Sequence, residues 1–79
     1  MATISATITQ GGSPLVGATV TFGDVASLVT DENGTVSATV AEDFSVFVAL
    51  TVEHGDLLGG RRDYGIHLFK AGGAYTFTV

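Results

Sequence analysis

The stretch GSPLVGATVTF, residues 12–22, opens on a turn, passes through a proline and then alternates apolar with polar side chains. Proline has no backbone N–H, so in sheets it stands at an edge or at the first residue of a strand. The stretch TDENGTV, residues 30–36, contains Asn33-Gly34, a pair that tolerates the positive φ angles of tight hairpin turns. These two stretches predict a strand at 15–22 and a tight turn at 31–34.

Alternation with a period of two residues continues along nearly the whole chain, which indicates half-buried strands. We expect seven strands, at residues 3–9, 15–22, 26–30, 35–41, 44–54, 64–69 and 74–79. The side chains expected to face the core are Ile4, Ala6, Ile8, Val16, Ala18, Val20, Phe22, Val36, Ala38, Val40, Val46, Val48, Leu50 and Val52. This pattern predicts an all-β fold, a seven-stranded two-sheet sandwich of the immunoglobulin-like or prealbumin-like type. A partly closed barrel is the alternative.

Length and composition indicate a single domain, residues 1–79, with no disulfide to support a small core. Charged residues make up 14% of the chain, the net charge is −5, and only Arg61, Arg62 and Lys70 are positive. Nucleic-acid binding needs several clustered cations, and anionic membranes attract polybasic segments. We therefore expect no nucleic-acid partner and no docking on a membrane.

The first residues, MATIS, have no basic region and alternate in polarity, so they are interpreted as a strand rather than a signal peptide. No run approaches the roughly 20 apolar residues of a spanning helix, so no membrane insertion is expected. For a complete gene product, these features predict synthesis in a cytoplasm without export by a signal peptide. For a domain cut from a longer protein, that expectation does not apply.

The first half of the chain resembles the carboxypeptidase regulatory-like (transthyretin-like) β-sandwich, and is similar to collagen-adhesin B-type and bacterial immunoglobulin-like modules. The resemblance is carried by Gly12, Pro14, Leu15, Gly17, Ala18, Val20, Thr30, Asp31, Gly34 and Val36. It implies a fold and a role as a spacer, adhesion or assembly module, and it implies no chemistry. Every matching residue has a structural role in a turn, a strand entry or the core.

The transthyretin-like fold includes a hydrolase of 5-hydroxyisourate, which uses histidines, an arginine and a C-terminal Tyr-Arg-Gly-Ser. This chain has His54 and His67 but ends in Thr-Phe-Thr-Val, and neither histidine lies in that motif. We expect His54 to be exposed at a strand end and His67 to face outward. The resemblance to collagen-adhesin modules implies a Lys–Asn isopeptide bond, but Lys70 and Asn33 occur in the wrong order for it.

No cofactor or metal site is expected. The segment at residues 31–34 has too few oxygen donors for a calcium loop, and no His pair or Cys cluster is present for zinc. No glycine-rich loop precedes a helix, and no serine lies in a nucleophile-elbow motif. We therefore expect no enzymatic activity.

The most probable contact surface by composition is the irregular segment 55–64, which holds Arg61, Arg62 and Tyr64 among glycines. Arginine and tyrosine are enriched at interface hot spots. Phe47 and Phe69 are expected on the faces opposite their strands' apolar rows, where they would meet a partner. The alternative is an ordinary connection with Leu57 and Leu58 packed on the core.

The strands are rich in Thr and Val, and their middles carry almost no charge. Monomeric proteins usually guard sheet edges with Lys, Pro or inward charges. The sequence therefore predicts a non-catalytic structural or assembly module that binds a protein partner or copies of itself. A small virion protein of a tailed phage, in a capsid decoration or tail accessory role, is the leading hypothesis. The alternative is a spacer, adhesion or carbohydrate-binding domain of a secreted or cell-surface protein. Support for sugar binding is small, because the chain has no tryptophan and only Tyr64 and Tyr75 are available to stack on a sugar.

Overall fold

Two β-sheets packed face to face form the structure, a computed structural model that describes residues 1–79 apart from the side chain of Leu58. The strands are β1 (Ala2–Gln10), β2 (Ser13–Pro14), β3 (Thr19–Phe22), β4 (Ala26–Val29), β5 (Thr35–Val40), β6 (Ser45–Glu53), β7 (Arg61–Lys70) and β8 (Ala74–Thr78). A single 3₁₀ turn, η1 (Leu58–Gly60), precedes β7. In the described part of the chain, no helix is long and apolar enough to cross a membrane.

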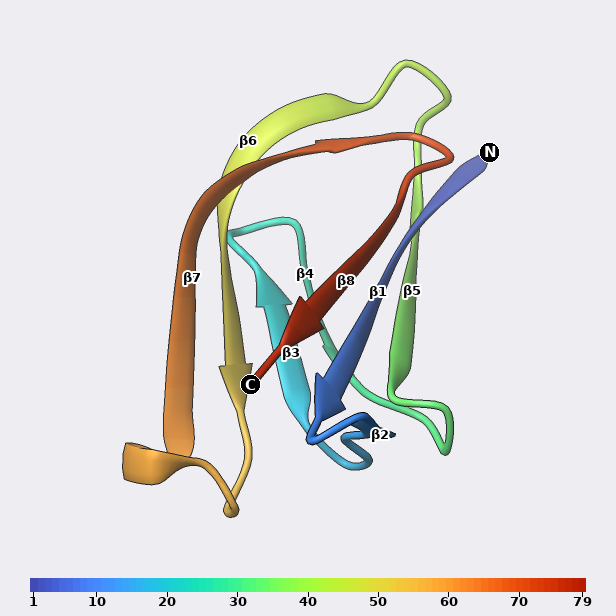
Figure 1. Cartoon of the computed structure of the whole chain (residues 1–79). Helices are drawn as coiled ribbons and strands as arrows, with labels where there is room; N and C mark the ends of the chain where they lie inside the picture. Colours follow the sequence, from blue (N-terminus) through green and yellow to red (C-terminus); the bar gives the residue numbers. More distant parts are fainter.

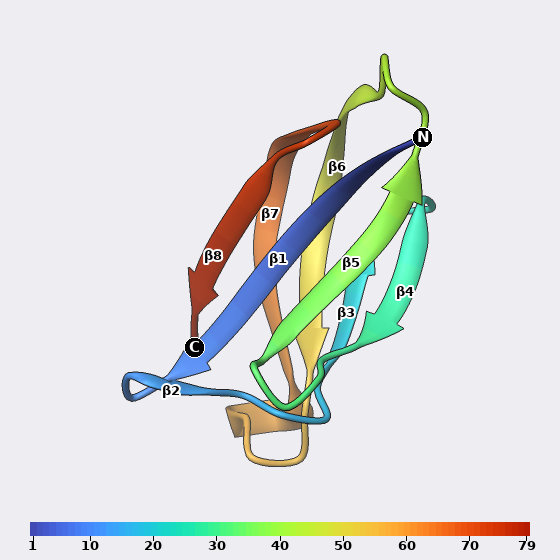
Figure 2. The same ribbon diagram turned by 90° about the vertical axis from the view of Figure 1, so that its right-hand side faces the viewer.

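The first sheet is built around β1, which has neighbours on both sides. It pairs antiparallel with β5 on one side, with Ala2 opposite Val40 and Thr7 opposite Thr35. The two-residue β2 continues that side beyond β5. On the other side β1 pairs in parallel with β8, so the first and last strands of the chain lie next to each other. Figure 2 shows β8, β1 and β5 as one layer in front of the other strands.

The second sheet has the order β4-β3-β6-β7, and all its pairs are antiparallel. β6 pairs with β3 only through residues 50–53, whereas it pairs with β7 along most of its length. The remaining half of the β6–β7 hairpin therefore extends beyond β3. Figure 1 shows these two strands bending together at the end where β7 leads into β8.

The core consists of the inward-facing side chains of both sheets. Its buried members are Ile4, Ala6, Ile8, Leu15, Ala18, Val20, Phe22, Val36, Ala38, Val40, Leu50, Val52 and Phe69. The predicted inward rows of residues 3–9, 35–41 and the later half of 44–54 are confirmed, because period two places alternate side chains on one face. Phe22 of β3 and Phe69 of β7 meet edge to face, with ring centroids 5.1 Å apart.

The prediction of one continuous strand at 15–22 is wrong. Gly17, with φ +75°, turns the chain, so the segment divides into β2 and the later β3. Leu15 is buried in consequence, and Val16, predicted to face the core, is 51% exposed. The buried Thr30 hydroxyl stabilises this turn: Oγ1 accepts from the Ala18 N–H at 2.9 Å and donates to the Leu15 carbonyl at 2.6 Å.

The turn predicted at residues 31–34 is confirmed, although it is not a hairpin turn. The Gly34 N–H donates to the Asp31 carbonyl at 2.9 Å, and Asp31 Oδ1 accepts from the N–H groups of Asn33 and Thr35. Gly34 alone has positive φ in this turn, at +72°. The turn connects β4 of one sheet with β5 of the other.

The strand predicted at residues 64–69 is longer in the structure, and the predicted facing of its later residues is wrong. β7 begins at Arg61, and a β-bulge lies opposite Leu50, where the register moves from Ala49–Ile66 to Thr51–Asp63. Gly65, with φ +75°, lies at this bulge. One extra residue reverses the alternation, so Phe69 faces the core and is 0% exposed. The expectation that Phe69 faces a partner is therefore wrong.

Candidate functional site

The five residues predicted to contact a partner do not form one surface. Arg61 lies opposite Glu53 on the outer face of the second sheet, and its guanidinium is 3.4 Å from an Asp63 carboxylate oxygen. Arg62 is on the other face of β7, because successive side chains of a strand alternate. Tyr64 is half-buried beside Arg62, and Phe69 lies in the core. Arg61, Arg62 and Phe47 are exposed, and Phe47 is 70% exposed.

The segment predicted as a loop from 55 to 64 is only partly irregular. Residues 61–64 belong to β7, and the true connection between β6 and β7 consists of residues 54–60 with η1. Leu57 packs against the core, as the alternative interpretation expected. The prediction for the Leu58 side chain lies outside the described residues.

Tyr64 joins the two sheets at the open side between β7 and β8. Its hydroxyl donates to the Thr78 carbonyl at 2.9 Å, and its ring lies 5.0 Å from that of Phe77. The Arg62 guanidinium carbon is 5.7 Å from the centre of the Tyr64 ring, within cation–π range. Burial raises the pKa of the Tyr64 phenol above its usual value of 10.0, and the positive charge of Arg62 partly opposes this.

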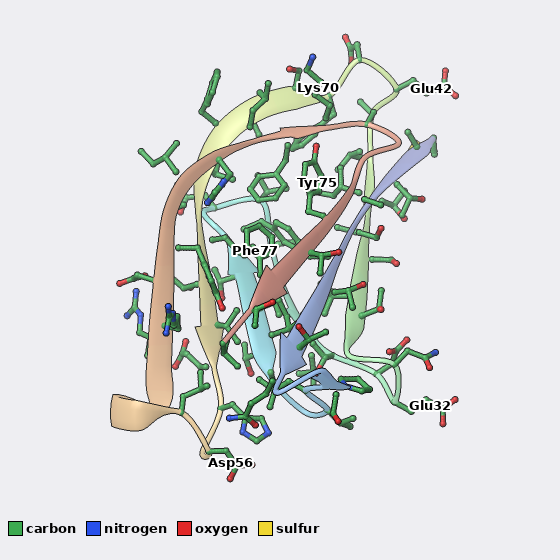
Figure 3. The ribbon with its side chains drawn as sticks, viewed as in Figure 1. Glu32, Glu42, Asp56, Lys70, Tyr75 and Phe77 are labelled. Carbon is green, nitrogen blue, oxygen red and sulfur yellow. The ribbon has the colours of Figure 1, made fainter. Side chains whose placement is uncertain are left out.

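Further aromatic side chains continue this contact along the same side of the molecule, and we call the whole group the aromatic seam. It consists of Tyr64, His67, Phe69, Tyr75 and Phe77. Figure 3 shows Tyr75 and Phe77 along β8, pointing toward the space between the sheets. The Tyr75 hydroxyl accepts from the Lys70 N–H at 2.9 Å. The seam therefore closes the gap between β7 and β8, which belong to different sheets.

Both histidines have structural partners in the described part of the chain. His54, predicted to be exposed, is half-buried: its Nδ1 accepts from the Asp56 N–H at 3.0 Å. The assignment that follows places the proton on Nε2, which donates to the Val16 carbonyl at 2.9 Å. His67, predicted to face outward, is exposed, although the bulge places it on the inward row of β7 opposite Val48.

The His67 ring packs edge-on against Phe77, with centroids 5.3 Å apart, and its Nε2 lies 2.9 Å from the Tyr64 carbonyl. Among the described residues, no three His, Cys, Asp or Glu side chains gather as a metal site, and no pocket indents the surface. The two histidines thus hold backbone carbonyls in place.

The most exposed apolar surface lies on the outer face of the β6–β7 hairpin. Phe47 and Ile66 are 70% and 71% exposed, and they occupy diagonally adjacent positions on paired strands. Leu68 lies directly opposite Phe47, and Ala49 directly opposite Ile66. We call these four residues the outer patch. Such neighbours across strands lie close enough for their side chains to form one continuous surface.

The outer patch was only partly found from the sequence, because the prediction included Phe47 but not Ile66. The signal that could have revealed Ile66 was Gly65, since an isolated glycine within a strand indicates a bulge. With the bulge, Ile66 and Leu68 share the outer face with Phe47, whereas Phe69 moves to the core.

Comparison with known proteins found no match to this chain. No family model matches the chain, no curated protein is similar to it, and no solved structure matches its fold.

Proposed function

We propose that this chain is a non-catalytic structural module that attaches to a protein partner in a larger assembly. The observation that carries the proposal is the outer patch: Phe47 and Ile66 are exposed at diagonally adjacent positions on the β6–β7 hairpin. Large side chains exposed next to one another are more informative than single exposed ones, because grouped apolar surface marks interaction sites.

The chemistry around the outer patch suits a protein surface. Ser45 and Lys70 are the flanking pair at one end, and the carboxylates of Glu53 and Asp63 lie toward the other end, beside Arg61. An apolar centre with a polar and charged rim is the usual anatomy of a protein interface. The partner we propose therefore presents an apolar patch of its own to Phe47 and Ile66.

The finer fold type is also part of this proposal. Two packed sheets of short strands, with the first and last strands paired, support a sandwich of the immunoglobulin-like or prealbumin-like type. The resemblance carried by residues 12–36 supports the carboxypeptidase regulatory-like group. Tailed phages use small sandwiches of this kind as repeated surface subunits, and this analogy supports a virion role as capsid decoration or tail accessory.

The test places a photo-crosslinking amino acid at position 47 in the protein as it occurs in its cells or particles. We expect adducts with a single protein species, in a constant ratio of that protein to this chain. The matched control carries the same group at Thr76, which is exposed on the first sheet. Equal adducts from both positions, or none from position 47, would contradict the proposal. Adducts with polysaccharide would favour the adhesion alternative.

A paired-variant experiment tests the same surface. Phe47→Ser with Ile66→Ser removes the apolar centre of the outer patch. We expect this double variant to fail to incorporate into the assembly while keeping its thermal unfolding transition. Thr51→Ser, at a polar position on the same face, is the control and should assemble normally. Assembly unaffected by the double variant would refute the role of the outer patch.

A further inference from the structure

The outward rows of the β6–β7 hairpin match one another in pairs. Because side chains alternate along a strand, every second residue of β6 faces outward beside an outward residue of β7. The pairs in the ladder are Ser45–Lys70, Phe47–Leu68, Ala49–Ile66, Thr51–Asp63 and Glu53–Arg61. Apolar side chains lie opposite apolar ones, a carboxylate lies opposite a cation, and no pair joins like charges. The two rows, with the outer patch at their centre, are therefore complementary to each other.

A surface with this pairing is also complementary to a second copy of itself. Two copies can meet face to face about a two-fold axis that runs between β6 and β7 and parallel to both. This axis exchanges the two strands, so each side chain of β6 lies over the residue of the second copy that it already faces across the hairpin. Phe47 lies over Leu68 of the second copy, and Glu53 lies over Arg61 of the second copy. A two-fold contact uses the same patch on both copies, so it requires this self-complementarity.

The charges of the outward rows favour this contact, although the whole chain has a net charge of −5. The rows carry two cations and two carboxylates, so their own charges sum to zero: Arg61, Lys70, Glu53 and Asp63. The remaining acidic residues lie outside these rows, at Asp24, Asp31, Glu32, Glu42, Asp43 and Asp56. At physiological ionic strength the Debye length is about 8 Å, and repulsion between exposed charges farther apart than that is largely screened. The facing rows can therefore meet without net repulsion between them.

Glu53 gives a second indication of a charged partner at this face. It lies directly opposite Arg61 in the ladder, but the Arg61 guanidinium is 3.4 Å from an Asp63 carboxylate oxygen instead. Among the described residues, Glu53 forms no ion pair. The two-fold axis brings Arg61 of the second copy over this carboxylate, and the symmetry produces two such pairs. Exposed ion pairs contribute little affinity, but unlike charges across an interface fix its register.

Two other arrangements of copies are less well supported. A two-fold axis perpendicular to the strands would place Lys70 over Asp63 of the second copy. It would also bring Glu53 toward Asp43 of the second copy, and like charges opposite one another are destabilising. The outer face of the first sheet is uncharged as well, but its outward residues on β1 and β5 are all Ser or Thr. That face therefore has no apolar area to drive association.

We infer that the partner at the outer patch is a second copy of this chain, packed face to face about the axis between β6 and β7. This inference rests on the proposed function and names the partner of the same site. Phe47, Ile66 and Leu68 of both copies form the apolar centre, and the Glu53–Arg61 pairs fix the orientation. Two strands offer less than the roughly 800 Å² per partner of a standard interface, so the dimer is weak. Repetition of the chain in an assembly raises its occupancy through effective concentration.

The first test is sedimentation equilibrium of the full chain, up to the highest soluble concentration. We expect the unmodified chain to form a dimer, and Phe47→Ser with Ile66→Ser to remain monomeric. A monomeric unmodified chain, or a dimer that persists in the double variant, would overturn the inference. The photo-crosslinking amino acid at position 47 separates this inference from the proposed function. Adducts with a different protein alone would support the attachment but overturn the second copy as its partner, whereas no adducts would contradict both.

Charge exchange tests the orientation of the two copies. Glu53→Arg alone places a cation over Arg61 of the second copy, and we expect the dimer dissociation constant to rise at least about threefold. Glu53→Arg with Arg61→Glu exchanges the two charges and should restore most of the affinity of the unmodified chain. Glu32→Arg, in the turn at residues 31–34, is the control: it changes the net charge equally and should not weaken the dimer. Weakening by Glu32→Arg, or no recovery in the double variant, would overturn the proposed axis. Circular dichroism of each variant confirms that the comparison is between folded chains.

Discussion

The Tyr64 hydroxyl donates a hydrogen bond to the Thr78 carbonyl at 2.9 Å, and this bond links the two sheets where no backbone ladder joins them. Tyr64 comes from β7 and Thr78 from β8, strands that are consecutive in sequence but belong to different sheets. The same phenol ring packs on Phe77. One residue therefore combines a polar and an apolar contact at the open side of the molecule.

Removing this hydroxyl should weaken the seam without collapsing it. We expect Tyr64→Phe to lower the free energy of unfolding by about 1 kcal/mol near neutral pH, because one hydrogen bond is lost while the ring contact stays. Urea unfolding followed by tyrosine fluorescence or circular dichroism measures the difference. An unchanged midpoint would show that water replaces the bond at no cost.

Alkaline pH should reduce stability through the same residue. Burial raises the pKa of Tyr64 above 10.0 in the folded chain, so folding favours the protonated phenol. The resulting stabilisation is fully present below the unfolded value and is lost as pH rises through the raised folded value. Unfolding curves of the unmodified chain and Tyr64→Phe should therefore converge above pH 10. A constant difference across that range would contradict the assignment.

Substitution of Thr30 should destabilise the fold far more than substitution of an exposed threonine. Its buried hydroxyl serves two backbone groups, the Ala18 N–H and the Leu15 carbonyl. Thr30→Val leaves both groups without a partner, and we expect a loss of about 2–4 kcal/mol in the free energy of unfolding. Thr30→Ser keeps the hydroxyl and should restore most of it. Thr76→Val, at an exposed position, is the control for the chemical change, and equal losses in both valine variants would refute the argument.

Gly34 is required both for its backbone angle and for the space around it. Its φ is +72°, and a Cβ there would lie 2.6 Å from the Ile8 carbonyl oxygen and 2.9 Å from Pro14 Cβ. Gly72 has a similar φ of +79° with no atom within 4 Å of such a Cβ. We expect Gly72→Ala to cost about 1–2 kcal/mol from the backbone angle alone, and Gly34→Ala to cost clearly more. Thermal unfolding of the two variants measures this gap, and similar costs would show that the chain relaxes around residue 34.

Alanine substitutions of the two phenylalanines predicted to contact a partner should have very different effects on stability. Phe69→Ala empties a core position against Phe22 and should cost about 3–5 kcal/mol in unfolding free energy. Phe47→Ala removes an exposed ring and should change stability by less than about 0.5 kcal/mol. Denaturant unfolding of both variants measures the contrast. A large loss in Phe47→Ala would place that ring against the fold rather than on a free surface.

Much of the fold could be predicted because its signals are local. The inward rows of β1, β5 and β6 follow from alternation, and the turn at Asp31 follows from a side chain that binds nearby backbone. The candidate site was harder to predict, since a partner surface depends on which side chains remain uncovered. Phe47 was found by its position against the alternation, whereas Ile66 was not predicted and Phe69 was wrongly assigned to the surface.

The sequence by itself determined an all-β chain, its turns and most of its core, because the period of two residues and the glycine positions act over a few residues. The tertiary structure alone decided which strands pair, which face β7 presents after Gly65, and which sheet edge stays open. One extra residue at a bulge reverses the facing of every residue after it. An edge is open or closed according to side chains that arrive from distant parts of the chain, as Tyr75 does at the Lys70 N–H.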